Sequence, residues 1–218
     1  MSTHHPDDEL LLSYATAQAD AGTMVVVGAH VEGCAHCRAR LRLFDSVGGE
    51  WLDTLEGEPL AVDSLARTLA MIDETPLKPI RTLVRRDALR PRLPDGVRWP
   101  SSLASAKVSR WHWVGPGMRF SRVRLPHAPS ANVFLLRIGA GKFLPDHRHE
   151  GIELTQVMYG AFGDGRSTFS AGDFDATDSE VRHQPIVGHG ECICLATISG
   201  RLSFQSPLAR AMGAVMGI

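Results

Sequence analysis

The sequence lacks the long apolar segments and the one-sided charge that mark several protein classes. No apolar run approaches the length of a membrane span, and no basic segment leads into an apolar one near the first residue. The formal net charge of −1 gives no sign of a nucleic-acid partner. With 44% hydrophobic and 22% charged residues, the 218-residue chain is typical of a soluble globular protein, and we expect it in the cytoplasm.

Cysteine is scarce, and its four positions form two close pairs, Cys34 with Cys37 and Cys192 with Cys194. This spacing is typical of free thiols or metal ligands in a reducing compartment, so we predict no structural disulfide. Cys192 and Cys194 alternate on an expected strand and therefore share one face. They could form a redox-sensitive pair, although two small buried apolar side chains would show the same pattern.

Charge is balanced overall but unevenly divided along the chain. Residues 1–80 hold thirteen acidic and five basic residues, whereas residues 81–98 hold six arginines and two aspartates. Five prolines between 75 and 100 prevent a long helix from crossing that segment. The change predicts a helical domain at 1–80, a Pro/Arg-rich linker at 81–100, a β domain at 101–205 and a C-terminal helix at 206–218.

Four helices are expected in the first domain, each with a residue that can cap it. They run from Asp7 or Asp8 to Gly22, from Thr23 to Gly33, from Ala35 to Trp51 or beyond, and onward from Asp63 or Ser64. After residue 100, short apolar stretches are separated by Gly, Pro and Asp turns at strand-like intervals. The predicted fold class is therefore α+β, with a four-helix domain followed by an all-β domain.

The β domain contains residues of the types that bind metals. His147, His149 and Glu153 share parity, so on extended strands their side chains project to the same face. Two imidazoles and a carboxylate can then converge on one ion. Together with Gly141 and Gly160, the three residues match the first cupin motif at full spacing.

A second motif supplies the fourth candidate ligand. The eleven-residue interval from Gly172 to His183 resembles the second cupin motif, although Asp178, Glu180 and Val187 stand where that family has proline, glycine and asparagine. The resemblance implies a cupin β-barrel that holds one ion. Three nitrogens and one oxygen suit zinc, iron, manganese, nickel or copper, so the ligand types alone leave the metal open.

The helical domain contains a second set of candidate ligands. His30, Cys34 and Cys37 stand at i, i+4 and i+7, which is one stripe of a continuous helix, and could share a cation. A structural zinc site has four ligands, and either His4 or His5 could supply the last one.

The segments HPDDELLLSYA and HVEGCAHC resemble the zinc-binding anti-sigma domain of ChrR-type regulators, which also carry a C-terminal cupin. The resemblance covers both domains and their order. It implies one zinc ion in the helical domain and favours zinc for the cupin as well. The ligands that it implies for the helical domain are His5, His30, Cys34 and Cys37.

The resemblance also implies a function. ChrR-type regulators are anti-sigma factors, so the chain is expected to sequester a group 4 (ECF) sigma factor one-to-one and release it on oxidative stress such as singlet oxygen. An acidic helical domain agrees with this, because sigma factors expose basic surfaces for promoter DNA. No enzymatic activity is expected.

The alternative is a dioxygenase-like cupin metalloenzyme with an N-terminal interaction domain. An octahedral ion held by four protein groups keeps two positions for substrate and oxygen.

Overall fold

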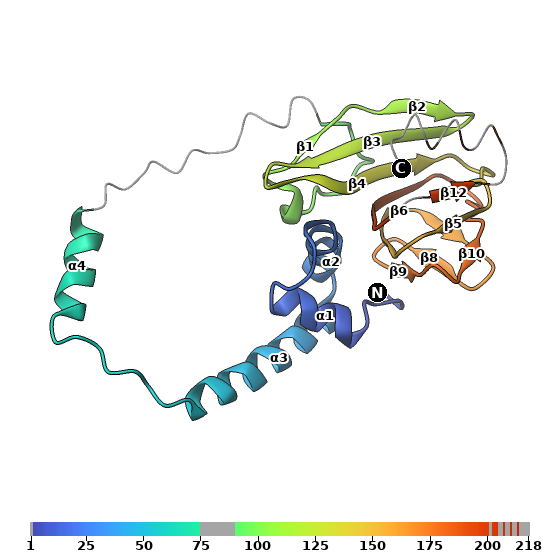
Figure 1. The fold of residues 1–218 in the computed structure, drawn as a ribbon. Coiled ribbons are helices and arrows are strands. Elements are labelled where there is room, and N and C mark those ends of the chain that lie inside the picture. The colour runs from blue at the N-terminus through green and yellow to red at the C-terminus, as the bar shows by residue number, and fades with distance from the viewer. Residues whose placement is uncertain are drawn as a thin grey trace.

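The computed structural model describes residues 2–74, 90–200 and 202–204, and the single positions 207, 210 and 213. Four helices come first and a strand-rich domain follows (Figure 1), which confirms the predicted α+β fold class. The helices are α1 (Asp8–Ala15), α2 (Ala21–Gly33), α3 (Ala35–Thr54) and α4 (Ser64–Glu74). Much of the predicted linker and most of the predicted C-terminal helix lie outside the described residues.

The connection between α1 and α2 differs from the prediction. The first helix ends at Ala15 rather than Gly22, and Asp20 rather than Thr23 caps the second. Gly22 lies in the first turn of α2, where an added Cβ would overlap the Thr197 hydroxyl of a neighbouring strand. The glycine therefore permits a close approach of helix and sheet and does not end a helix.

The described residues of the β domain form three sheets. The largest has the order β1-β3-β4-β11-β6-β9, with β2 paired to β3, and the smaller ones are β10-β5-β12 and β7-β8. A short 3-10 helix, η2 (Ser101–Leu103), precedes the first strand. The strands are β1 (Lys107–Val108), β2 (His112–Gly115), β3 (Met118–Leu125), β4 (Ala128–Ile138), β5 (His147–His149), β6 (Glu153–Tyr159), β7 (Ala161–Gly163), β8 (Thr168–Ser170), β9 (Phe174–Thr177), β10 (Arg182–His183), β11 (Cys192–Ile198) and β12 (Leu202–Phe204).

The large sheet has a hydrophobic core on each face, and its strand β11 lies between them. All seven residues of β11 are buried, and their side chains alternate between two cores. Cys192 and Cys194 face the interior of the β domain, with their sulfur atoms 3.6 Å apart, while Ile193 and Leu195 face the helices. The redox role of the two thiols stays a hypothesis.

The helices share a core with the sheet. Val26, Val27 and His30 of α2 are buried, and α2 contacts β4, β6 and β11. Figure 1 shows α1, α2 and the start of α3 next to the sheet. Burial of a valine stabilises the fold by roughly 1.5–3 kcal/mol, so this packing fixes the position of α2 against β6. The domain limits drawn from the sequence remain predictions, but the core extends across the predicted boundary.

Residues 47–74, here called the apolar arm, contrast with this packed region. Every residue of the arm is exposed apart from the half-buried Ser64. Figure 1 shows that α4 stands away from the other elements. No helix among the described residues is long and apolar enough to cross a membrane.

Candidate metal centres

Among the described residues, three groups of His, Cys, Asp and Glu bring their ligand atoms within 4.8 Å of one another. The first two bring together the candidate ligands named from the sequence, with His5, which the resemblance implied, as the fourth member of the first, and the third was not predicted. The groups are His5, His30, Cys34 and Cys37; His147, His149, Glu153 and His183; and Asp164, Asp175 and His183.

The N-terminal cluster forms at a break between two helices. His30 lies in the last turn of α2, and Cys37 lies in the first turn of α3. Cys34 stands between them in an extended conformation, with φ −103° and ψ 110°, and its sulfur accepts a hydrogen bond from the Cys37 N–H. The spacing predicted that the three residues share one stripe of a continuous helix, and this prediction is wrong because the helix breaks at Cys34. The break turns their side chains toward His5, which precedes α1.

The distances within this cluster fit a tetrahedral ion. The Nδ1 atom of His5 is 3.4 Å from His30 Nε2 and 3.4 Å from Cys34 Sγ, and Cys37 Sγ is 3.3 Å from His30 Nε2. Zinc bonds of about 2.0–2.3 Å in tetrahedral geometry place ligand atoms roughly 3.3–3.8 Å apart. Two nitrogens and two sulfurs at these separations form a donor set that suits zinc.

Burial favours the neutral forms of His5, His30 and Cys37 when no cation is near. It lowers the pKa of the His30 and His5 imidazoles. Burial and the adjacent Cys34 raise the pKa of the Cys37 thiol to about 12. A cation held here would favour the thiolate, so binding of a metal would release protons.

The neighbouring histidines point elsewhere. His4 Nε2 lies 2.8 Å from the Ser167 hydroxyl, and its Nδ1 lies 3.5 Å from a carboxylate oxygen of Asp173. The ring of His36 stacks on the ring of His5 at a centroid distance of 4.6 Å. The geometry therefore favours His5 over His4 as the fourth ligand.

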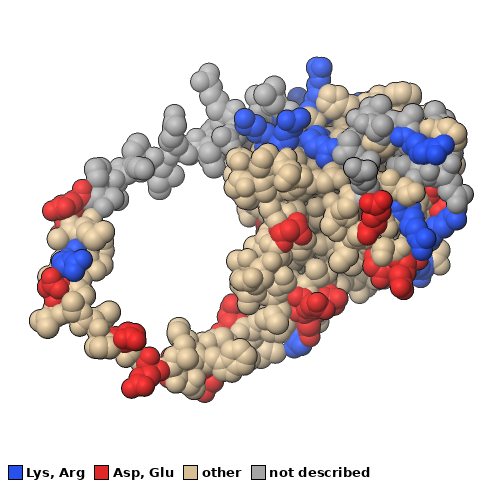
Figure 2. All heavy atoms as spheres, viewed as in Figure 1, with Lys and Arg blue, Asp and Glu red and all other residues tan. Residues whose placement is uncertain are grey.

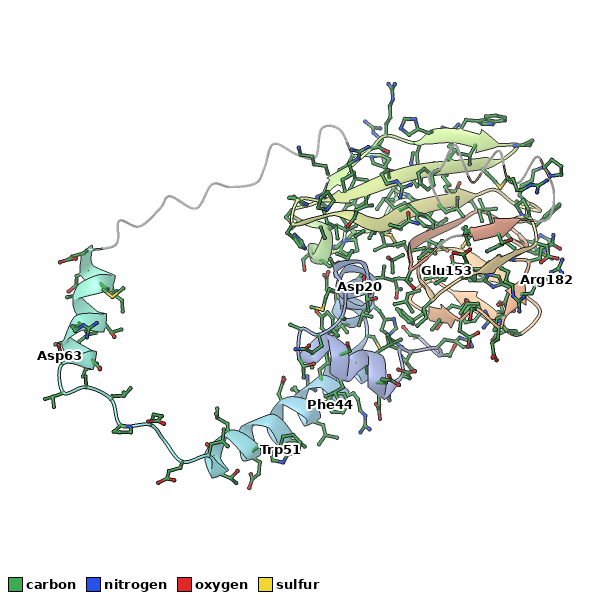
Figure 3. The ribbon with its side chains drawn as sticks, in the orientation of Figure 1. Asp20, Phe44, Trp51, Asp63, Glu153 and Arg182 are labelled. Atoms are coloured by element: carbon green, nitrogen blue, oxygen red, sulfur yellow. The ribbon has the colours of Figure 1, made fainter. Side chains whose placement is uncertain are left out.

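The cupin cluster is assembled from three strands. His147 and His149 project from β5, Glu153 begins β6, and His183 of β10 pairs with His147 in an antiparallel ladder. Figure 3 shows Glu153 within the β domain. The three histidines are buried, and their Nε2 atoms all face the Glu153 carboxylate.

The distances in the cupin cluster also fit a shared cation. His183 Nε2 lies 3.2 Å from the Nε2 atoms of His147 and His149. Glu153 Oε2 lies 3.0 Å from His149 Nε2 but is a buried atom with no hydrogen-bond partner of good geometry among the described residues. The Nδ1 atom of His147 donates to the Pro145 carbonyl at 2.8 Å, which leaves its Nε2 lone pair directed at the cluster. A ring nitrogen and a carboxylate oxygen so arranged would suit a cation shared by the four side chains.

The electrostatics of the cupin cluster agree with this interpretation. Burial by itself raises the pKa of Glu153, but the three histidines lower it well below its usual value. For His183, burial lowers the pKa, while the Glu153 carboxylate more than offsets this and raises it. The carboxylate is therefore charged at neutral pH and available as a ligand.

The third group supports the cupin cluster and does not form another ion site. The Arg166 guanidinium donates to both Asp164 and Asp175, where a cation would otherwise lie. Asp164 also approaches His183, with Oδ2 3.5 Å from Nδ1. No motif in the sequence marks Asp164, because it lies in an ordinary Gly-Asp-Gly turn.

The motif glycines and the departures from the cupin pattern also find a structural explanation. Gly141, Gly160 and Gly172 have φ values of 65°, 72° and 98°, a conformation that favours glycine. Where the family has proline and glycine, Asp178 accepts hydrogen bonds from the backbone N–H groups of Glu180 and the next residue. The turn before His183 is thus held by a side chain instead.

A cavity of about 370 Å³ lies beside the cupin cluster. It has the size of a small-molecule site. Its lining residues are Asp146, His147, Arg148, Arg182 and Ser203. Of the four candidate ligands, His147 is the one that reaches it.

Comparisons with known proteins show the family to which the chain belongs. A family model described as a ChrR cupin-like domain matches residues 101–202. The anti-sigma-E factor ChrR of Cereibacter sphaeroides is 35% identical over 213 residues, which is 95% of this chain and 94% of that protein. The crystal structure of Rhodobacter sphaeroides SigE in complex with the anti-sigma ChrR matches with a TM-score of 0.73 at 30% identity, covering 91% of this chain and 100% of that one. The chain therefore belongs to the ChrR family of anti-sigma factors.

Proposed function

We propose that this chain binds and inhibits a group 4 (ECF) sigma factor in a one-to-one complex and releases it on oxidative stress such as singlet oxygen. Family membership supports the proposal, because the matched crystal structure holds a ChrR together with SigE. The proposed location is the cytoplasm, where a sigma factor meets RNA polymerase. The proposed role is regulatory and requires no enzymatic activity.

The exposed apolar arm is the observation that carries this proposal. It exposes large hydrophobic side chains that have no core to enter, including Trp51 at 71%, Leu65 at 72% and Ile72 at 64%. Exposed apolar surface of this extent marks a partner site, and amphipathic helices bind partners through such faces.

The charge of the arm fits a basic partner. Residues 47–74 hold seven acidic residues and one basic residue. Figure 2 shows red and tan surface along this segment and little blue. Opposite charges steer association and favour the correct partner. A sigma factor has basic surfaces for promoter DNA, so its chemistry complements the arm.

Zinc is the metal that we propose for the N-terminal cluster, with His5, His30, Cys34 and Cys37 as ligands. When bound, zinc would link the segment before α1 to the break between α2 and α3. Four protein ligands leave no position for a substrate, so the role is structural. The ligands would hold α3, and with it the start of the arm, in a fixed direction.

A divalent metal, zinc in our proposal, belongs to the cupin cluster of His147, His149, Glu153 and His183. We assign sensing to this half of the molecule. A cavity lies beside His147, and β6, which carries Glu153, also contributes Leu154 to the core shared with the helices.

The test is size-exclusion chromatography with light scattering on the full chain mixed with a purified group 4 sigma factor from the same genome neighbourhood. Two tryptophans provide a matched pair of variants. Trp51 on α3 and Trp113 on β2 are 71% and 70% exposed, so neither substitution should unfold the protein. Figure 3 shows Trp51 on the outward part of α3.

Wild type is expected to form a one-to-one complex. Trp51→Ala should weaken it roughly 30-fold, because truncation of a central interface tryptophan costs about 2 kcal/mol or more. Trp113→Ala should stay within twofold of wild type. Equal affinities for the two variants would overturn the assignment of the arm as the partner surface. Absence of a complex with the folded, zinc-loaded wild type would overturn the anti-sigma function.

The cavity beside His147 favours a second candidate, a dioxygenase-like cupin metalloenzyme whose N-terminal half is an interaction module. The same four cupin ligands would hold an octahedral ion with two free positions. A protein that consumes oxygen when loaded with iron, yet forms no complex with the sigma factor, would establish this alternative.

A further inference from the structure

A hydrogen bond from the β domain reaches a candidate ligand of the N-terminal cluster. The Nδ1 atom of His30 lies 2.9 Å from Oε1 of Gln156 on β6, and both side chains are buried. The amide nitrogen of Gln156 donates to the Val157 carbonyl at 3.0 Å. A carbonyl can only accept, so the amide oxygen must be the atom that faces His30.

This bond fixes which nitrogen of His30 carries the proton. An amide oxygen cannot donate, so Nδ1 of His30 is the protonated nitrogen. The Nε2 lone pair is then directed at Cys37 Sγ, 3.3 Å away, and at His5 Nδ1. A metal-binding histidine needs this tautomer, and a partner on its other nitrogen commonly sets it.

A second contact from the β domain holds the segment that carries His5. The Asp173 carboxylate accepts from the backbone N–H groups of Thr3 at 2.6 Å and His4 at 3.1 Å. The Phe174 N–H donates to the His4 carbonyl at 3.1 Å. The residue before His5 is thus fixed to the start of β9.

We infer that the cupin sheet completes the N-terminal metal centre, with Gln156 as the positioning residue of His30 and Asp173 as the anchor of the segment before His5. The inference rests on the proposed zinc centre and adds to it two residues from the other half of the molecule. Gln156 touches no metal itself. It holds the imidazole in the tautomer and orientation that bind one.

The experiment measures metal affinity in the full chain. Co²⁺ reports selectively on this centre, because of the two four-residue clusters only the N-terminal one contains thiols, and thiolate-to-cobalt bands appear in the near ultraviolet. Zinc affinity is then measured by displacement of Co²⁺ and by competition with a chelator. The variants are Gln156→Met, which keeps the volume but removes the acceptor, and Gln156→Glu, which keeps an acceptor oxygen. Gln18→Met, at an exposed position between α1 and α2, is the matched control.

Gln156→Met is expected to weaken zinc binding about 10- to 100-fold, as loss of a partner behind a ligating histidine usually does. Gln156→Glu should stay within about threefold of wild type, and Gln18→Met should match wild type. In ¹⁵N spectra of the zinc-loaded protein, the slowly exchanging Nδ1 proton of His30 should be visible in wild type and lost in Gln156→Met. The inference is overturned if Gln156→Met binds zinc within twofold of wild type.

The cobalt spectrum of wild type tests the proposed zinc centre separately from the role of Gln156. If wild type shows no thiolate-to-cobalt band, the proposed zinc centre fails, and the positioning role fails with it. If wild type and Gln156→Met show the same band and the same affinity, the zinc centre stands and only the role of Gln156 is lost. Asp173→Ala, which removes the anchor of residues 3 and 4, should weaken zinc binding by a smaller factor than Gln156→Met.

Discussion

The two metal centres bring four ligand atoms together in opposite ways. The N-terminal cluster gathers two imidazoles and two thiols from a helix end, a helix break and an extended segment. The cupin cluster gathers three imidazoles from the paired strands β5 and β10 and a carboxylate from β6 of the large sheet, and a cavity of about 370 Å³ lies next to it. The first arrangement closes around an ion and joins separate parts of the chain. The second is built from strands of two sheets, and one of its candidate ligands, His147, lines a cavity. Four ligand atoms close together therefore do not by themselves show what a metal centre does. The types of the ligand atoms and the access of other molecules to the site decide whether its role is structural or chemical.

The largest effect is expected from Cys34→Ala. Structural zinc contributes on the order of 10 kcal/mol or more to the fold of small zinc modules, and this variant removes one of four ligands. We expect the thiolate-to-cobalt band to fall sharply, zinc affinity to drop at least about 100-fold and sigma-factor binding to be lost. Zinc content, circular dichroism and chromatography with the partner measure this.

The control for this variant is Cys192→Ala, which removes a buried thiol outside both clusters. It should keep the zinc of the N-terminal centre and the sigma complex. If Cys34→Ala inhibits the sigma factor as wild type does, the N-terminal centre is not needed for binding.

The variant His149→Ala tests the cupin centre in the same way. It removes a cupin ligand whose Nε2 lies 3.0 Å from Glu153, so metal at the cupin centre should be lost. Because no residue of the arm or of the N-terminal cluster is substituted, the variant with zinc in excess should still bind the sigma factor within about threefold of wild type. It should no longer release the sigma factor when exposed to singlet oxygen. Metal content and release from a labelled complex measure the two effects.

His189→Ala is the matched control, since His189 is exposed and lies in no ligand group among the described residues. It should bind and release the sigma factor like wild type. If His149→Ala loses its cupin metal and still releases the sigma factor on exposure to the oxidant, the sensing role of the cupin is wrong.

The sequence predicted the ligand sets better than their surroundings. For the cupin cluster, spacing indicated which side chains converge, because alternate residues of a strand share a face. For the N-terminal cluster, spacing indicated His30, Cys34 and Cys37 but left the fourth residue open between His4 and His5. The resemblance to ChrR-type regulators favoured His5 over His4, and the contacts of His4 with Ser167 and Asp173 give the physical reason.

Long-range packing could not be predicted from local pattern. Gly22 indicated a helix end, but it permits α2 to approach β11, which lies more than 170 residues along the chain. The segments of α2 and α4 both contain several apolar residues. Nothing local distinguished α2, which enters the core, from α4, which has no buried residue. The contact of Gln156 with His30 could not be predicted, because a single glutamine in an apolar strand does not indicate which residue it contacts.

The smallest effect is expected where the two centres meet, on β6. This strand carries Glu153 of the cupin cluster at its first residue and, three residues later, Gln156, which contacts His30 on the other face. Loss of the cupin metal in His149→Ala should loosen Glu153 and the start of β6, and so weaken zinc binding at the N-terminal centre. We expect a factor of about 3–10, equivalent to roughly 0.6–1.4 kcal/mol of coupling between the sites. Cobalt and zinc titrations of the thiolate-containing centre measure it.

The effect of His149→Ala is measured both in the wild-type chain and in the Gln156→Met variant. If β6 transmits the effect through the hydrogen bond to His30, the variant that lacks this bond should show no further loss when His149→Ala is added. An equal loss in both backgrounds would mean that the two centres affect each other through general stability. Coupling confined to the background with Gln156 would identify β6 as the element that links a change at the cupin ligands to the helices that hold the arm.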